Sequence, residues 1–302
     1  MFVNRVAGAG RGERSLRSVR GAFERMEVTA EFVAPTSAAE MEARVRAAVA
    51  GGTRLLFAMG GDGTVQAVVN AVGVRRDREN DVVIGVLPSG GGNDFASALG
   101  MPKDLSDAAS ALCSATTTIR SVDLLRARTG DGATRLYLGG GGVGLDVETS
   151  RHAAGSYRRW PGRSRYVAAA LRALRDFEPL GVRVEFPDDD VASIDARALV
   201  AGVLNTPSYG GGLRVTPDAR VDDGLLDVAI VKPLGTRQVV ALVPRLLATG
   251  GLPESYFIRA RSRTVILQTD RACLFHGDGE ILGPAPVRIE VVPNAIRVLA
   301  PA

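Results

Sequence analysis

Two glycine-rich turns contain the residues of this sequence that are best suited to bind phosphate. The first, Gly60-Gly61-Asp62-Gly63-Thr64, follows the apolar run 55–59, and the second, Gly90-Gly91-Gly92-Asn93-Asp94, follows the apolar run 82–87. Glycines let the backbone approach a phosphate closely, and the N-terminus of a following helix offers N–H groups to the anion. One such turn alone would more often be an empty strand-to-helix connection. Two of them at the carboxyl ends of neighbouring strands define one crevice, so we predict nucleotide binding there.

Two acidic segments later in the chain could act on a bound phosphate. Phosphoryl transfer requires a phosphate cradle, a divalent metal and a group that orients or deprotonates the attacking hydroxyl. Asp278-Gly279-Glu280 lies between apolar runs and predicts a hairpin that exposes two carboxylates, with a plain Asp-Gly turn as the alternative. Asp222-Asp223-Gly224-Leu225 offers two carboxylates and a backbone carbonyl, which are the hard oxygens that a divalent cation needs. A polar turn before the strand 226–231 is the alternative for this second segment.

The elements that must position these segments change in character along the chain. After a short first strand at 2–4, we expect strands at 28–33, 55–59, 82–87 and 121–125 alternating with helices at 38–50, 65–72 and 105–112, which indicates a parallel sheet covered by helices. Beyond residue 125 short strands predominate, at 136–138, 182–186, 198–204, 226–231, 264–269, 272–276 and 287–292, with helices at 157–177 and 236–248. This second pattern is typical of an antiparallel β-sandwich.

The sequence therefore predicts two domains, as its 302 residues also suggest. We expect an α/β nucleotide-binding domain at 1–125 and a β-sandwich domain at 126–293. The segment 294–302 could return to the first domain. The segment from Asn4 to Gly12 would close the rim of the nucleotide crevice, with a flexible terminus as the alternative.

Composition narrows the setting in which the protein works. Two cysteines and two histidines, without metal-ligand spacing, do not suit a disulfide framework or a zinc site and favour a reducing, cytoplasmic environment. Because no run of 18 apolar residues occurs, a lipid substrate would be met from outside the bilayer. The net charge is +4, and all but two of the 37 basic residues are arginines, which suit phosphate contact where they cluster.

The two turns and the late acidic segment together resemble the catalytic family of diacylglycerol kinases, which includes bacterial lipid kinases and sphingosine kinases. The family hallmark is Gly-Gly-Asp-Gly-Thr, and the fold it implies for the first domain is that of NAD kinases and phosphofructokinases. Further matches are Asn70, Asn93-Asp94-Phe95-Ala96, Asp123, Gly144-Leu145-Asp146, Gly210-Gly211-Gly212, Asp223-Gly224 and Asp278-Gly279-Glu280. The resemblance thus spans nearly the whole chain and implies ATP and Mg²⁺ as cofactors, with a lipid alcohol as phosphate acceptor.

The resemblance also implies roles for individual residues. Glu280 would accept the proton of the lipid hydroxyl and Asp278 would support it, while Asp62 would either bond within its loop or orient nucleotide and hydroxyl. Asp223 and the carbonyl of Leu225 would bind the metal, with Asp123 linked through water. The implied nucleotide contacts comprise both glycine turns and four residues nearer the N-terminus: Asn4, Ala7, Gly8, Thr36, Gly60, Gly61, Asp62, Gly63, Thr64, Gly90, Gly91, Gly92, Asn93 and Asp94.

Three residues depart from the family pattern. Arg5 stands where a proline is usual, and Gly91 stands where a threonine often contacts the nucleotide, which removes a hydroxyl contact. Arg220 occupies a position that can hold a further metal-binding carboxylate, so the metal could be bound mainly through ATP. We expect weaker nucleotide binding but an intact phosphate cradle.

A basic segment with interleaved aromatic residues could contact a membrane. Between residues 151 and 175, arginines alternate with aromatic side chains, including Arg158, Arg159, Trp160 and Arg163. Arginines attract anionic headgroups and tryptophan settles at the interface, so we predict peripheral membrane association. A solvated helix face whose aromatics pack inward is the alternative. No nucleic-acid recognition motif accompanies the charge, and a homodimer is a reasonable expectation.

The predicted activity is transfer of the γ-phosphate of ATP to a lipid hydroxyl, with diacylglycerol as the expected acceptor and phosphatidic acid as the product. Sphingoid bases, polyprenols and other lipid alcohols remain open. Two alternatives are an NAD kinase-like enzyme acting on a soluble nucleotide and a regulator that binds nucleotide or lipid without catalysis.

Overall fold

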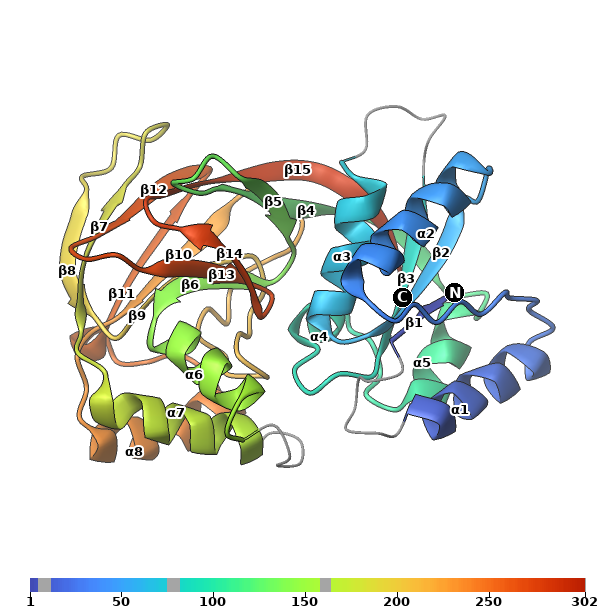
Figure 1. Ribbon diagram of the computed structural model, residues 1–302, viewed down its shortest axis with the longest axis horizontal. Coiled ribbons are helices and arrows are strands. Elements are labelled where there is room, and N and C mark those ends of the chain that lie inside the picture. The colour runs from blue at the N-terminus through green and yellow to red at the C-terminus, as the bar shows by residue number, and fades with distance from the viewer. Residues whose placement is uncertain (5–11, 75–81, 158–163, 302) are drawn as a thin grey trace. The chain divides into compact units, whose positions relative to one another are not determined.

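The computed structural model describes residues 1–4, 12–74, 82–157 and 164–301, and the side chains of residues 12, 13, 154 and 164–167 are not described. The chain forms two compact units. Unit 1 comprises Met1–Asp123 and Pro293–Ala302, and unit 2 comprises Leu124–Val292. The chain therefore leaves unit 1 two residues before the position at which we placed the boundary, and its end returns to unit 1 (Figure 1).

Unit 1 is built on a parallel sheet. Its strands are β1 (Phe2–Val3), β2 (Leu55–Gly60), β3 (Val83–Pro88) and the C-terminal part of β15 (Val287–Ala300). β2 pairs with β3 along its full length, from Leu55↔Val83 to Gly60↔Pro88. β15 adds to the other side of β3 at Arg297 and Val298, also in parallel. Because β2 and β3 run side by side in the same direction, the turns that follow them lie at the same edge of the sheet.

Five helices accompany this sheet in the described part of unit 1: α1 (Gly12–Arg25), α2 (Ala38–Ala50), α3 (Asp62–Val72), α4 (Asp94–Ala98) and α5 (Leu105–Leu112). Local capping defines two starts, since the Ser37 hydroxyl accepts the Glu40 N–H and the Asp104 carboxylate accepts two N–H groups in the first turn of α5. α1 packs against α5, and α2 packs against α3. The strands between these helix pairs are buried almost throughout, which explains their uninterrupted apolar runs.

Unit 2 contains two antiparallel sheets. One sheet joins β15 to β12 (Thr264–Thr269), β7 (Leu180–Glu185) and β8 (Ile194–Ala198), with β4 (Thr118–Arg128) and β5 (Thr134–Tyr137) on the other side of β15. The second has the order β11 (Phe257–Ser262), β10 (Leu226–Val231), β9 (Val200–Leu204), β6 (Gly140–Gly144), β13 (Leu274–Gly277) and β14 (Glu280–Pro284). This arrangement confirms the predicted fold class of an α/β domain followed by an antiparallel sandwich.

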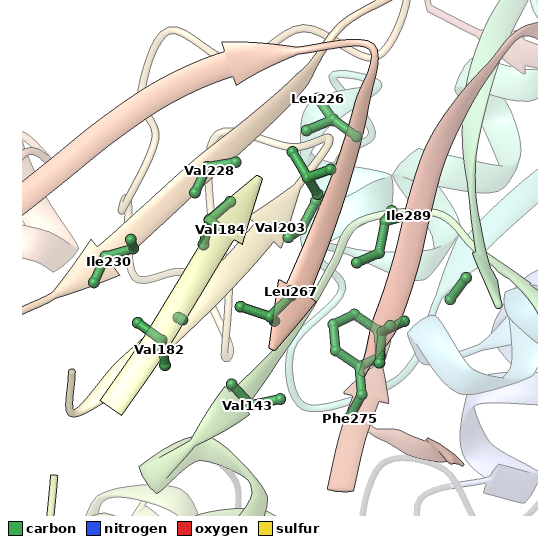
Figure 2. Close-up of a cluster of buried hydrophobic side chains, with 14 of the residues drawn as sticks. Val143, Val182, Val184, Val203, Leu226, Val228, Ile230, Leu267, Phe275 and Ile289 are labelled. Atoms are coloured by element: carbon green, nitrogen blue, oxygen red, sulfur yellow. The ribbon is translucent and has the colours of Figure 1, made fainter. Parts of the chain in front are cut away.

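The core of unit 2 contains buried side chains from both sheets (Figure 2). Val182 and Val184 of β7 belong to this cluster, and the residues between and beside them are more exposed. This period of two is the one that the sequence pattern predicts for a half-buried strand. Phe275 of β13 is fully buried in the same cluster, and its ring contacts that of Tyr137 edge to face at a centroid distance of 5.9 Å.

Three helices and a short 3₁₀ helix complete the described part of unit 2. They are α6 (Leu145–Ala154), α7 (Ser164–Asp176), α8 (Thr236–Ala248) and η1 (Glu254–Tyr256). α6 packs against α7, and α7 contacts α8. A smaller apolar cluster, which includes Leu145, Leu174 and Leu234, lies among these helices and the neighbouring strands.

Several predicted elements were wrong in extent. Residues 28–33 form no strand and make one bridge, Phe2↔Val33, because β1 is only two residues long and offers no longer partner. The expected strand 198–204 is divided at Leu199 between β8 and β9, which belong to different sheets. The helix expected at 157–177 begins at Ser164 in the described residues, and α6 precedes it. β6 and β11 were missed, β6 because four of its five residues are glycine.

Candidate nucleotide site and acidic segments

The two glycine turns of unit 1 are in contact through their backbones. They follow β2 and β3, and the Ser89 N–H donates to the Gly60 carbonyl at 2.9 Å. A Cβ atom added at Gly90 would lie 2.4 Å from the Cα of Gly61, and one added at Gly61 would lie 3.2 Å from the Cα of Gly90. The distance at Gly90 leaves no room for a side chain, and the distance at Gly61 is tight. The two turns can therefore approach this closely because Gly90 is a glycine.

Side chains fix the shape of the second turn. The Asn93 amide oxygen accepts the Gly90 N–H and its nitrogen donates to the Gly90 carbonyl, both at 3.0 Å. Asn93 itself is left-handed, with φ of 60°, a conformation that asparagine tolerates better than most residues. α4 begins directly after it at Asp94, which is buried. The turn is therefore held in one shape without any ligand.

Asp62 connects the first turn to the second. Its carboxylate accepts the N–H of Asp94 and that of Phe95, both at 3.2 Å, and so caps α4 from a neighbouring loop. Of the two roles considered for Asp62, bonding between the loops is the one visible in this unit. Burial, together with the negative charge of Asp94, raises the pKa of Asp62 to about 6, although the backbone N–H groups oppose the shift.

The raised pKa of Asp62 predicts a pH-dependent contribution to stability. A carboxyl whose folded-state pKa is raised stabilises the fold below its unfolded pKa of 3.8, and this contribution is lost as the pH rises towards 6. We expect the stability of the wild type relative to Asp62→Asn to increase by up to about 3 kcal/mol between pH 7 and pH 4. Chemical denaturation of both proteins across this range measures the difference. A difference that does not vary with pH would contradict the assigned pKa.

The residues predicted near the N-terminus are only partly placed. The Asn4 amide donates to the Thr64 hydroxyl at 3.0 Å, which joins the end of β1 to the first turn of α3. Ala7 and Gly8 lie outside the described residues. Thr36 hydrogen-bonds within its own segment. Its N–H and its hydroxyl both donate to the Glu40 carboxylate at 2.8 Å, at the start of α2.

The first glycine turn leads into a helix N-terminus of the kind that suits an anion. α3 starts there without a side-chain cap, and the second turn packs against the first with no side chain between them. The buried Ser89 hydroxyl, in the second turn, also has no hydrogen-bond partner among the described residues. Ser89 was not among the predicted contacts, although its place beside the glycines could have suggested it.

In unit 2, Asp278 and Gly279 form the two-residue turn between β13 and β14. Their φ angles are 53° and 90°, as a tight Asp-Gly hairpin requires. The Asp278 carboxylate accepts the N–H groups of Leu138 at 2.7 Å, Gly139 at 2.9 Å and Gly140 at 3.3 Å. Asp278 thus fixes the hairpin to the start of β6, whereas Glu280 is exposed at the first position of β14.

Asp278 should consequently be a large local contributor to the stability of unit 2. Asp278→Ala removes the acceptor of three backbone N–H groups and places alanine at a positive φ, so we expect a loss of about 3 kcal/mol. Asp278→Asn retains one oxygen and tolerates the left-handed backbone, so its loss should be about half as large. Denaturant unfolding of the three proteins measures both. An alanine variant as stable as the wild type would show that the three hydrogen bonds to the Asp278 carboxylate do not stabilise unit 2.

A buried polar cluster of three side chains lies beside the same hairpin. The Asp146 carboxylate binds the Tyr209 hydroxyl at 2.7 Å and the His276 Nε2 at 3.0 Å, and Tyr209 and His276 are 2.7 Å apart at these same atoms. Burial would raise the pKa of Asp146, but the charge and hydrogen bond of His276, with the Tyr209 and Val147 bonds, hold it below its usual value.

The glycines of β6 make room for this cluster. A Cβ at Gly140 would lie 2.6 Å from the Tyr209 ring, and one at Gly142 would lie 2.9 Å from the Asp146 carboxylate. Sequence reasoning identified Gly144-Leu145-Asp146 and Gly210-Gly211-Gly212 as family matches but assigned no role to Tyr209 or His276. The available signal was that Asp146 lies in one of these motifs and Tyr209 lies directly before the other. That Asp146, Tyr209 and His276 contact one another depends on the tertiary fold.

The residues predicted to bind a metal do not fit one in this structure. Asp223 accepts the Leu225 N–H at 3.1 Å with one oxygen, and the other binds the Arg261 guanidinium. Asp123, in unit 1, is buried and accepts the Asn294 N–H at 2.7 Å. Among the described residues, no group of three or more His, Cys, Asp or Glu side chains is arranged to hold a metal ion.

The predicted membrane-docking segment is only partly described. Arg158, Arg159, Trp160 and Arg163 lie outside the described residues, between α6 and α7. No helix in the described ranges is both long enough and apolar enough to cross a bilayer.

These observations define the class of protein. A parallel α/β unit with two contacting glycine turns is followed by an antiparallel sandwich with an Asp-Gly hairpin. Residues 1–127 match the diacylglycerol kinase catalytic domain, and residues 141–300 match the YegS C-terminal NAD kinase beta sandwich-like domain. The chain belongs to the diacylglycerol kinase family, which confirms the predicted resemblance and the assignment as a lipid kinase at the level of the family.

Whole-length relatives agree with this assignment. The chain is 30% identical to a "Diacylglycerol kinase" of Mycobacterium tuberculosis, over 99% of this chain and 94% of the relative. It is equally 30% identical to a "Probable lipid kinase YegS-like" of Stenotrophomonas maltophilia, over 98% and 94% of the two chains. A crystal structure of a diacylglycerol kinase from Bacillus anthracis has the same fold, with a TM-score of 0.72 at 18% identity, covering 99% of this chain and 95% of that one.

Proposed function

We propose that this protein transfers the γ-phosphoryl group of ATP to the hydroxyl of a membrane lipid, with diacylglycerol as the acceptor and phosphatidic acid as the product. The observation that carries the proposal is the contact between Gly61 and Gly90, which places the second turn against the N-terminal end of α3 with no side chain between them. Family membership and the name of the mycobacterial relative support the choice of a lipid acceptor.

In this proposal the residues of unit 1 hold the nucleotide. The backbones of the two turns bind the phosphates. Asp62 joins the turns through its hydrogen bond to the Asp94 N–H, and Asn93 holds the shape of the second turn through its hydrogen bond with Gly90. Mg²⁺ would have to be supplied with ATP, and it would offset the charge that develops during transfer. The Asp223 segment is not assigned a metal, because Arg261 occupies its carboxylate.

The acceptor chemistry is assigned to the acidic hairpin of unit 2. The lipid hydroxyl oxygen forms a bond to the γ-phosphorus, the bond from that phosphorus to the β,γ-bridging oxygen breaks, and ADP leaves. Glu280 takes the hydroxyl proton, a role that suits an exposed carboxylate at the start of β14, next to the anchored Asp278-Gly279 turn. Asp278 acts as a positioning residue, since backbone N–H groups engage both of its carboxylate oxygens.

Because the acceptor lies in a bilayer, we also propose peripheral association with the membrane through the arginine-rich segment at 151–175. Replacing Arg158, Arg159 and Arg163 with glutamate should reduce sedimentation with anionic vesicles, and unchanged sedimentation would remove this part of the proposal.

A homodimer is proposed as well, and analytical ultracentrifugation of the full chain tests it.

The experiment that tests the function is transfer of labelled γ-phosphate from ATP, with Mg²⁺, to a panel of lipid alcohols in mixed micelles. The panel contains diacylglycerol, a sphingoid base and a polyprenol, and NAD is assayed in parallel. A phosphorylated lipid establishes the activity and identifies the acceptor. Product only with NAD would show a kinase of a soluble nucleotide, and ATP binding without any product would show a regulator.

A further inference from the structure

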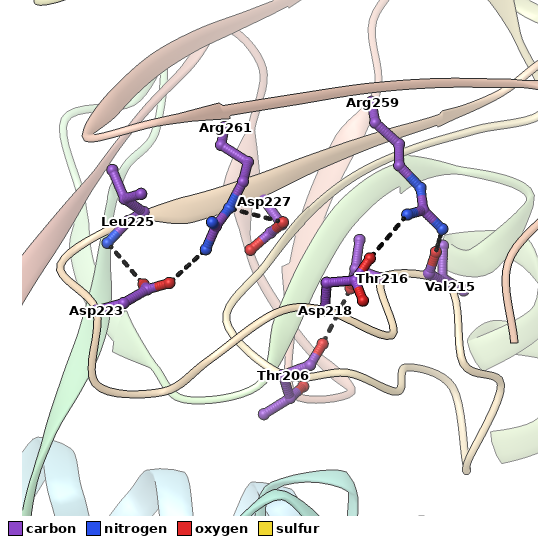
Figure 3. A network of polar contacts seen from close by, with 9 residues as sticks. All are labelled: Thr206, Val215, Thr216, Asp218, Asp223, Leu225, Asp227, Arg259 and Arg261. Atoms are coloured by element: carbon purple, nitrogen blue, oxygen red, sulfur yellow. Dashed lines mark hydrogen bonds and ion pairs between the residues drawn. The ribbon is translucent and has the colours of Figure 1, made fainter. Parts of the chain in front are cut away.

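An arginine lies between two carboxylates at the acidic turn of unit 2 (Figure 3). The Arg261 guanidinium binds Asp223 through Nη2 and Asp227 through Nε, the latter at 3.2 Å. The second oxygen of Asp223 accepts the Leu225 N–H at 3.1 Å, within the turn. The side chains of Asp223 and Asp227 are only 20% and 11% exposed, so these two charges are largely withdrawn from water.

The backbone places Arg261 at this position. Asp227 of β10 and Arg261 of β11 are direct partners in the antiparallel ladder between these strands. Cross-strand partners hold their side chains within reach of each other, so this ion pair is built into the register of the sheet. Asp223 then reaches the same guanidinium from the turn that precedes β10. Arg261 thereby ties this turn to the sheet.

The surrounding carboxylates are also paired with arginines. Arg220 binds Asp222 at 3.2 Å, and Arg259, two residues before Arg261 on β11, binds Asp218 at 3.4 Å. Arg220 is the residue that departs from the family pattern at a position where a further carboxylate can occur. Arg220 therefore adds a positive charge next to the turn, whereas a metal site would need a negative charge there.

A divalent cation bound by both Asp223 and Asp227 would have to displace the Arg261 guanidinium from their carboxylates. It would need the carboxylate oxygens that the guanidinium binds, and it would be repelled by a like charge at close range. One oxygen of Asp227, Oδ2, is buried without a hydrogen-bond partner in the described structure. Removing the guanidinium would leave two nearby carboxylates uncompensated, with this buried oxygen available to a hard cation.

We propose that Arg261 takes the structural place of a divalent cation between Asp223 and Asp227, so that this turn is held by the chain's own charge and contains no resident metal. Arg261 has this role in the nucleotide-free protein, whether or not the proposed lipid kinase activity is found. It also leaves Mg²⁺ bound through ATP unaffected.

The test is thermal unfolding of the full chain without nucleotide, in EDTA and in millimolar Mg²⁺ or Ca²⁺. Wild type should unfold at the same temperature in all three solutions. Arg261→Gln should unfold several degrees lower in EDTA and recover most of the loss when the cation is added. Asp223→Asn in the Arg261→Gln background should abolish this recovery, and Arg259→Gln, on the same strand, should show no cation dependence.

Arg261→Lys keeps a positive charge and provides a second route if Arg261→Gln folds poorly. It should remain insensitive to EDTA and to added cation. A wild type that is destabilised by EDTA, or that binds Mg²⁺ without nucleotide in a calorimetric titration abolished by Asp223→Asn, would overturn the proposal. An Arg261→Gln variant whose unfolding temperature does not respond to either cation would overturn it as well.

Discussion

Replacing Glu280 with glutamine should lower kcat for lipid phosphorylation by about 10²–10⁴-fold, the usual contribution of a positioned general base. The amide cannot accept the hydroxyl proton, yet it has the size of the carboxylate. Glu280 is exposed at the start of β14, so the fold should change in stability by less than about 0.5 kcal/mol. The measurements are steady-state transfer to the acceptor that the lipid panel identifies, ATP binding by calorimetry, and thermal unfolding.

Glu254→Gln is the matched control for this prediction. Glu254 is an exposed glutamate of the same unit, in η1. The Glu254→Gln substitution should leave kcat unchanged. An Asp278→Asn variant should differ from Glu280→Gln by losing stability along with rate, because Asp278 anchors the hairpin. A Glu280→Gln enzyme that retains the wild-type kcat would remove Glu280 from the reaction and leave the nucleotide site to be judged separately.

Replacing Gly90 with alanine should weaken ATP binding by at least about tenfold. The new methyl group would lie 2.4 Å from the Cα of Gly61 and 2.8 Å from the Asn93 amide oxygen, so the two turns must separate. In the proposed site the phosphates bind to the backbone of these two turns, so displacing that backbone weakens binding. A loss of about 1.4 kcal/mol corresponds to the tenfold change. Calorimetric titration with ATP measures the loss, and circular dichroism confirms the fold.

Gly61→Ala and Gly21→Ala provide a graded comparison. A methyl group at Gly61 would lie 3.2 Å from the Cα of Gly90, a smaller overlap, so its effect on ATP affinity should be weaker than that of Gly90→Ala. Gly21 is within α1, where a methyl group has room, and alanine there should stabilise the helix without changing ATP affinity. Equal ATP affinity in all three variants would show that the contact between the turns does not shape the site.

Sequence patterns were sufficient for the elements with strong periodicity or strong turn chemistry. The helix expected at 38–50 coincides with α2, because its apolar residues recur at helical spacing and Ser37 caps its start. The Asp-Gly hairpin at 278–279 could likewise be predicted, since a two-residue turn with positive φ angles selects this pair. The glycine turns were predictable for the same reason, as their chemistry is local.

Elements with weak local signals were not predictable. β6 is composed mainly of glycine, which disfavours strands in general, and its glycines are explained only by the side chains that press against them. The single strand β15 had been expected as two pieces, because Pro293 and Asn294 interrupt its apolar pattern. Its residues pair in antiparallel fashion in unit 2 and in parallel fashion in unit 1, which no local pattern encodes.

The family, the two glycine turns and the acidic hairpin could be recognised from the amino-acid sequence, because each depends on residues that are adjacent in the chain. The partners of the carboxylates, in contrast, follow from the tertiary fold. Asp62 caps a helix that begins 32 residues later, Asp278 binds backbone 140 residues earlier, and Asp223 pairs with Arg261 on another strand. The role of a charged side chain is set by the groups that surround it in space, and strand order and register bring those groups together.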